Sequence, residues 1–235
     1  MKKRIWELDA FRGICIIGVV IVHFVYDLVD LYKIIDWKYP DWFWFVKQWG
    51  GVLFLLLSGT CITLGKHPIR RGLIVFGSGL IISLVTWAMY AWFNFDKGII
   101  IYFGVLHCLG ICMLLWPIFR KLPWWLLLIA GVGLVWLGLY FKGLTVESAY
   151  LFPIGLTNKY FRSSDFFPLL PHFGFFLLGA VVGKTLYRKK ESLLPKLDGK
   201  PVIGFFQWCG RQSLWIYLIH QPILNGICML LMELK

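Results

Sequence analysis

The chain has 235 residues, of which 59% are hydrophobic and 18% aromatic, and its mean hydropathy is +0.74. A water-soluble domain has about 45–50% apolar residues, so this composition excludes an ordinary soluble protein and indicates a polytopic membrane protein. The formal net charge is +12, but the basic residues lie between apolar runs and no nucleic-acid-binding motif accompanies them, so nucleic acid is not an expected partner.

Seven apolar runs predict seven membrane-spanning helices, because each is long enough to cross a hydrocarbon core of about 30 Å. Their approximate ranges are 11–29, 49–65, 72–94, 99–119, 123–141, 167–186 and 211–233. No soluble domain, low-complexity segment or internal repeat separates them. The basic N-terminus is followed by no small-residue cleavage site, so we interpret the first run as a span. We predict an all-α transmembrane bundle that forms a single domain over residues 1–235.

The loop charges predict the orientation of this bundle. If the N-terminus is cytoplasmic, sixteen of the 24 Lys and Arg residues lie on the cytoplasmic side, as the positive-inside rule requires. The odd number of spans then places the C-terminus outside. The cytoplasmic set is Lys2, Lys3, Arg4, Arg12, Lys66, Arg70, Arg71, Arg120, Lys121, Lys184, Arg188, Lys189, Lys190, Lys196, Lys200 and Arg211.

The first span combines a cation, an imidazole and a carboxylate in the stretch RGICIIGVVIVHFVYD (Arg12–Asp27). Eleven helical steps of about 100° place Arg12 and His23 on one face, about 16 Å apart along the axis. Asp27 follows His23 at i+4 and therefore lies on the same stripe. Imidazole titrates near neutral pH, which suits a general base, and a carboxylate one turn away can select its tautomer. We therefore predict His23 and Asp27 as the catalytic pair.

Two predicted outer loops are long enough to have a function. Residues 30–48 end in WKYPDWFWFVKQW, whose aromatic side chains favour a helix at the membrane–water boundary. Residues 142–166 contain further aromatic residues together with Asp165. A connection of this length in a compact bundle is either disordered or functional, and its aromatic content favours an ordered lid.

A short basic segment, KHPIRR, follows the second predicted span. Its Lys66, Arg70 and Arg71, together with Arg12, could form an anion clamp, because guanidinium groups match phosphate oxygens. The alternative is that these residues only satisfy topology, with Arg12 extending to the cytoplasmic interface.

Three further histidines, His107, His172 and His220, fall within apolar runs. Ionisable groups at membrane depth usually face the bundle interior and mark a site, although any one of them can also be a structural, hydrogen-bonded residue. Pro222 closely follows His220 and predicts a kink beside a cavity. The six cysteines have no metal-type spacing, and GAVVG (Gly179–Gly183) indicates close helix packing. No metal is predicted.

The opening LDAFRGICIIGVVIVHFVYD resembles bacterial proteins related to the catalytic domain of heparan-alpha-glucosaminide N-acetyltransferase. The resemblance continues in order through nearly the whole chain. The matching segments are WGGVLFLLLSGTCITLG (Trp49–Gly65), YFGVLHCLGI (Tyr102–Ile111), FPLLPHFGFFLLGAVVG (Phe167–Gly183) and CGRQSLWIYLIHQPIL (Cys209–Leu224). The Arg12 and His23 spacing also resembles the acyltransferase 3 family, whose basic motif after the second span is echoed imperfectly by Lys66, Arg70 and Arg71.

These resemblances imply a multi-pass protein of the bacterial cytoplasmic (inner) membrane that transfers an acetyl or related acyl group. Acetyl-CoA would bind from the cytoplasmic side and a sugar or glycan would be acylated outside. The histidine proposed to carry the acetyl group in the eukaryotic enzyme has no counterpart in FVKQWGG (Phe45–Gly51), so His23 is expected to be the base or carrier. The residues expected to hold CoA are Arg12, Lys66, Arg70 and Arg71, and those expected to bind the acceptor are His107, His172, His220 and Asp165.

Two other functions stay open at this point. A small proton-coupled transporter or flippase would use the buried histidines and Asp27 to relay protons or bind a solute, although no inverted repeat is recognisable. A non-catalytic membrane partner protein is the other alternative. A homo-oligomer is also compatible with the sequence.

Overall fold

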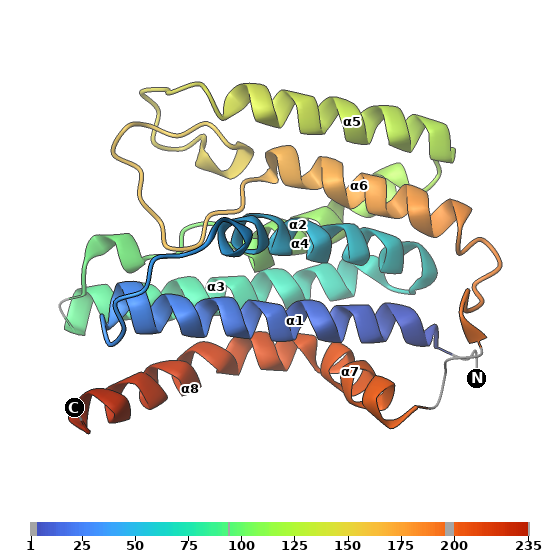
Figure 1. Cartoon of the computed structure of the whole chain (residues 1–235). Helices are drawn as coiled ribbons and strands as arrows, with labels where there is room; N and C mark the ends of the chain where they lie inside the picture. The colour runs from blue at the N-terminus through green and yellow to red at the C-terminus, as the bar shows by residue number, and fades with distance from the viewer. Residues whose placement is uncertain (1–3, 94, 196–199, 235) are drawn as a thin grey trace. The chain divides into compact units, whose positions relative to one another are not determined.

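A computed structural model describes residues 4–93, 95–195 and 200–234 (Figure 1). Lys2, Lys3 and Lys196 of the predicted cytoplasmic set lie outside these residues. Within them the chain is helical, with isolated bridges and no strand. The α-helices are α1 (Trp6–Tyr26), α2 (Asp41–Leu64), α3 (Pro68–Phe93), α4 (Val105–Phe119), α5 (Trp124–Phe141), α6 (Leu169–Thr185), α7 (Pro201–Arg211) and α8 (Ser213–Glu233).

The prediction of an all-α, multi-pass membrane protein is confirmed. Among the described residues, five helical segments are long and apolar enough to cross a membrane: α1 with its π-helical extension, α2, α3, α5 and α8. The helices α4 and α6 are apolar but shorter, with 15 and 17 residues. The seven-span count and the cytoplasmic N-terminus therefore stay predictions.

Two segments differ from the expected pattern. Residues 41–48, expected in a loop with its own surface helix, are instead the first turns of the continuous helix α2, which begins with an acidic residue suited to a helix N-terminus. The polar connection before the last span contains an additional helix, α7. Pro201 occupies its first turn, where a missing N–H costs nothing.

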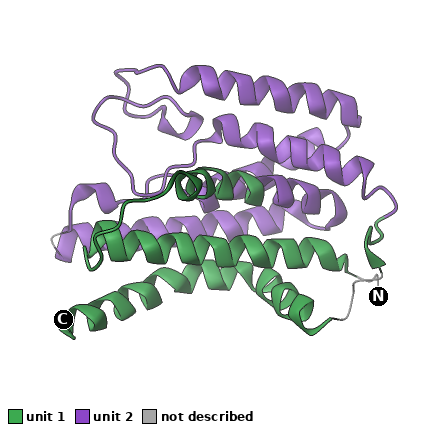
Figure 2. Ribbon diagram, viewed as in Figure 1, with its two compact units in different colours: residues 1–54, 190–235 green, residues 55–189 purple. Residues whose placement is uncertain are grey.

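The chain divides into two compact units (Figure 2), residues 1–54 with 190–235 and residues 55–189. We call these unit 1 and unit 2. The helix α2 contributes its first part to unit 1 and its second part to unit 2. The single-domain organisation stays a prediction, and each unit is described here by itself.

Unit 1 is built on α1, which packs against α7 and α8. The latter two meet at a bend below α1 in Figure 1. Backbones of α1 and α7 touch at two glycines: a Cβ at Gly13 would overlap the carbonyl of Phe206, and a Cβ at Gly210 would overlap the carbonyl of Asp9. Small residues allow such close approach where lipid provides no hydrophobic driving force between helices.

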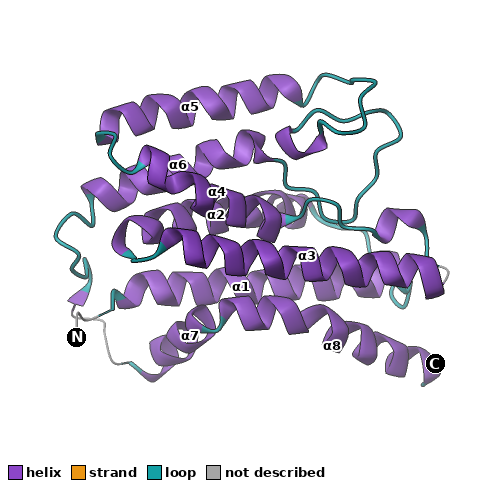
Figure 3. Ribbon diagram, turned by 180° about the vertical axis from the view of Figure 1, so that it is seen from behind, coloured by secondary structure: helices purple, strands orange, loops and turns teal. Residues whose placement is uncertain are grey.

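Unit 2 contains the pairs α5–α6 and α3–α4 and the second part of α2. The helices α5 and α6 lie side by side in both views (Figures 1 and 3). The GAVVG segment of α6 packs as predicted, since a Cβ at Gly179 would overlap the carbonyl of Leu56 in α2. The Thr60 hydroxyl lies 3.0 Å from the Gly179 carbonyl oxygen and donates to it.

Candidate functional site

In unit 1, α1 and α8 bring two of the predicted histidines together. The rings of His23 and His220 lie edge to face, with centroids 5.0 Å apart and planes at 88°. His220 is buried, with 7% of its surface exposed, and His23 is half-buried. The sequence predicted both residues as members of the functional site but gave no indication that they are neighbours.

The hydrogen bonds of His220 determine which of its ring nitrogens carries the proton. Nδ1 lies 2.6 Å from the carbonyl oxygen of Tyr217. A carbonyl oxygen only accepts, so Nδ1 is the donor, and Nε2 of the neutral ring is left with a lone pair. Nε2 is buried and has no hydrogen-bond partner among the described residues. His220 thus presents an unoccupied acceptor inside unit 1.

Asp27 is completely buried at the start of a π-helix, Asp27–Leu31 (η1), that extends α1. Its two carboxylate oxygens accept hydrogen bonds of 3.0 and 2.8 Å from Nε2 of Gln221 in α8. The Gln221 side chain also lies close to the His23 ring. The expected direct orientation of His23 by Asp27 is therefore replaced by an arrangement in which Gln221 lies between them.

Sequence reasoning missed Gln221. The available indication was a carboxamide beside His220 and Pro222 in an apolar helix, since any polar side chain at membrane depth needs a partner. Wide π-helical turns are also frequent at functional sites, but this one could not be inferred from spacing.

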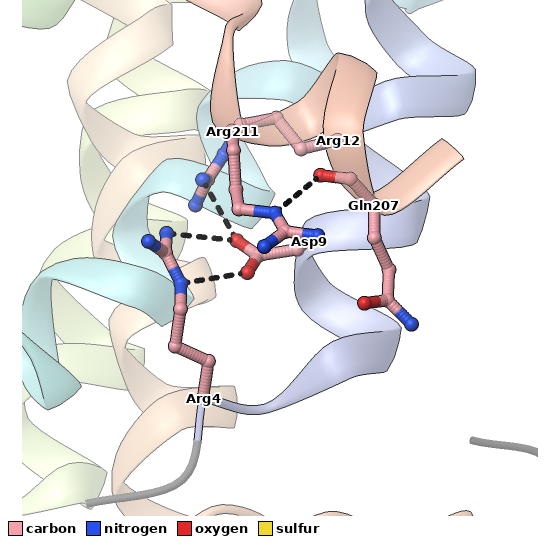
Figure 4. A network of polar contacts seen from close by, with 5 residues as sticks. All are labelled: Arg4, Asp9, Arg12, Gln207 and Arg211. Carbon is pink, nitrogen blue, oxygen red and sulfur yellow. Dashed lines mark hydrogen bonds and ion pairs between the residues drawn. The ribbon is translucent and has the colours of Figure 1, made fainter. Parts of the chain in front are cut away.

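At the other end of α1, three arginines surround a buried carboxylate (Figure 4). Asp9 accepts hydrogen bonds from Arg4 Nε at 2.9 Å and from Arg12 at 3.3 Å. Arg211 at the end of α7 donates to the Gln207 carbonyl oxygen beside them. Arg12 therefore forms an ion pair with Asp9. Because several arginines surround this single carboxylate, the cluster carries a net positive charge.

The other predicted cationic residues belong to unit 2. Lys66 and Arg70 are exposed, and Arg71 is half-buried, where α2 connects to α3. Arg12 belongs to unit 1, so the four-residue clamp stays a prediction.

His107 in unit 2 has both ring nitrogens occupied. Nδ1 accepts from the Gly104 N–H at 3.2 Å, so the proton is on Nε2, which lies 3.2 Å from the Ser83 hydroxyl. That hydroxyl donates to the Ile101 carbonyl oxygen. The ring also packs between Phe76 and Phe103. This environment favours a structural role for His107.

Asp165 accepts a 3.1 Å hydrogen bond from the Val105 N–H at the start of α4, which favours a role at this helix terminus. The loop that contains it makes further contacts. Ser163 and Ser164 donate to the carbonyl oxygens of Ile100 and Ile99, and Phe152 and Phe161 stack against each other.

His172 in α6 lies with Nδ1 2.7 Å from the Pro168 carbonyl oxygen, so that nitrogen donates. Its ring contacts Phe167. Within the part of the chain that the structure describes, no group of three or more His, Cys, Asp or Glu side chains is arranged to hold a metal ion.

Apolar helices long enough to span a membrane indicate a multi-pass membrane protein, and buried ionisable side chains lie on these helices. A family model described as "Heparan-alpha-glucosaminide N-acetyltransferase, catalytic" matches residues 4–222. The chain therefore belongs to this family of membrane acetyltransferases, as its resemblance predicted. Neither the comparison with curated proteins nor that with solved structures gives a match.

Proposed function

We propose that this protein transfers an acetyl or similar acyl group from cytoplasmic acyl-CoA to a hydroxyl or amine of an extracytoplasmic sugar or glycan. The observation that carries the proposal is the family match over residues 4–222, which include His23, Gln221 and the buried Asp27 and His220. The family's description names an amino sugar as the acceptor of its reference enzyme, and this supports an acceptor of that chemical class.

In the proposed reaction, the acceptor nitrogen or oxygen attacks the thioester carbonyl carbon while His23 takes the proton. The carbon–sulfur bond then breaks, and the CoA sulfur leaves with the electron pair and receives a proton. His23 suits this role because it is half-buried, and its ring lies against His220. Asp27 would act through Gln221, whose carboxamide it orients.

The CoA phosphates would bind at the end of α1 that carries Arg12. Arg4 and Arg12 share one carboxylate, so this end keeps positive charge for a phosphate. Lys66, Arg70 and Arg71 are proposed to contribute from the α2–α3 connection. His172 and His220 are proposed to contact the acceptor. For His107 and Asp165 this role is less well supported, because His107 has both nitrogens engaged and Asp165 binds the start of α4.

The first test is binding of acetyl-CoA to the purified, detergent-solubilised protein, measured by titration calorimetry. We expect micromolar affinity that is lost in the Arg70→Ala, Arg71→Ala double variant. No binding by the folded wild-type protein would refute the acyl-CoA proposal and favour a transporter or partner function.

The second test addresses the base. His23→Ala is expected to bind acetyl-CoA with nearly wild-type affinity and to lose transfer, measured as acceptor-dependent release of the CoA thiol. Near wild-type transfer by this variant would show that His23 is not the base.

A further inference from the structure

Three hydrogen-bond acceptor atoms of α8 are buried without a partner among the described residues: His220 Nε2, Gln221 Oε1 and Asn225 Oδ1. We call them the lone-pair cluster. Buried polar atoms are nearly always hydrogen-bonded, and each unpaired one is costly. Three within six residues of one helix therefore indicate a place where something else supplies hydrogen-bond donors.

Two of the three atoms have their direction determined by other contacts. The Gln221 amide nitrogen is directed at both oxygens of Asp27, so its oxygen faces away from Asp27, where the Gln221 side chain also contacts His23. The Nδ1–H of His220 is held by the Tyr217 carbonyl, so its Nε2 is a lone pair. These bonds orient both side chains to accept a further hydrogen bond beside the His23 ring.

The lone-pair cluster extends along α8 away from the arginine end of α1. His220 lies beside His23, and Gln221 lies beside Asp27, one turn further along α1. Asn225 follows Gln221 at i+4, about 6 Å further along the axis and about 40° around it. In the proposed topology, the lone-pair cluster therefore lies on the side of His23 from which the acyl acceptor approaches, opposite to the CoA phosphates.

Building on the proposed function, we propose that the lone-pair cluster recognises the acyl acceptor through hydroxyl or amino groups that neighbour the group being acylated. Such a site takes an acceptor with several adjacent donors, as a sugar ring has, and discriminates against a simple amine or alcohol. Asn225 lies outside the matched residues 4–222.

The test compares two acceptor probes with acetyl-CoA as donor: D-glucosamine and cyclohexylamine. Both carry an amine on a six-membered ring, but cyclohexylamine has no hydroxyl groups. The variants are Asn225→Leu, which removes one lone-pair acceptor at similar size, and Asn225→Asp, which keeps an acceptor oxygen. Gln212→Leu is the matched control, because it removes a carboxamide at the beginning of the same helix, outside the cluster.

We expect wild-type protein to prefer glucosamine in kcat/KM, and Asn225→Leu to reduce that preference about tenfold, as the loss of one well-placed hydrogen bond does. Asn225→Asp should restore part of it, and Gln212→Leu should leave it unchanged. Equal kcat/KM for the two probes in wild type, or equal losses for both in Asn225→Leu, would overturn the proposal in favour of a structural or water-filled cluster.

Two remaining outcomes separate this inference from the proposed function. Wild-type protein that binds acetyl-CoA but acylates neither probe would overturn the assignment of the cluster to a sugar-like acceptor. Failure to bind acetyl-CoA would instead refute the proposed function, and this inference with it.

Discussion

The contact between Asp27 and Gln221 is expected to be a strong determinant of stability in unit 1. Replacing Gln221 by Leu would leave the carboxylate of Asp27, which is 0% exposed, without the donor that now bonds both of its oxygens at 3.0 and 2.8 Å. A hydrogen bond to a charged group contributes about 1.5–3 kcal/mol, and an orphaned buried charge costs about 3–5 kcal/mol. We therefore expect Gln221→Leu to lower the free energy of unfolding by about 3 kcal/mol or more.

A double-mutant cycle isolates this contact from the general effect of adding leucines. Asp27→Leu alone leaves only a neutral amide unsatisfied and should cost less, about 1–3 kcal/mol. The variant with both substitutions removes both partners, so its loss should be smaller than the sum of the single losses by about 2 kcal/mol. The assay is reversible unfolding by SDS in mixed detergent micelles, followed by circular dichroism. Additive losses would show that the two side chains are not energetically coupled and would refute the reasoning.

Three other predictions concern packing and titration. Gly210→Leu should separate α7 from α1 and lower the melting temperature strongly, whereas Gly204→Leu in the same helix, where a Cβ meets nothing within 4 Å, should not; equal effects in a thermal melt would contradict the close contact. His107→Ala should destabilise the protein to heat without a specific effect on acceptor KM, because one ring nitrogen bonds Gly104 at the start of α4 and the other bonds Ser83 in α3. A selective rise in KM would contradict this. Burial, and then the 2.7 Å hydrogen bond to Asp30, raises the pKa of Tyr39. Its phenol should therefore stay protonated above pH ~10, and the stability that it contributes should decline as the pH rises past that value. The assay is an alkaline titration of the wild-type protein from which that of Tyr39→Phe is subtracted. A Tyr39 phenol that titrates with an ordinary tyrosine pKa would contradict the prediction.

The apolar runs were sufficient to predict the class of protein. A run of about 20 apolar residues is stable only in a membrane or a core, and it must be helical there because lipid offers the backbone no hydrogen bonds. The boundaries were less predictable: residues 41–48 and α7 lie outside the predicted spans, yet they are helical.

The individual histidines show a similar division. Their positions in apolar runs marked them equally as candidates, but their surroundings differ. His107 is fully engaged by Gly104 and Ser83, whereas His220 keeps an unpartnered nitrogen. Nothing in the local sequence distinguishes these cases, because the partners come from other turns and other helices.

What the sequence determined by itself is the helical membrane class, the family resemblance and the shared face of His23 and Asp27, since helix periodicity is a local property that spacing alone specifies. Only the tertiary structure decided that His23 meets His220 and that Gln221 lies between His23 and Asp27. Those contacts join α1 to α8, segments at opposite ends of the chain. Close approaches such as those at Gly13 and Gly210 pack α1 against α7, from which α8 continues, and no periodicity within either helix encodes that choice of neighbour.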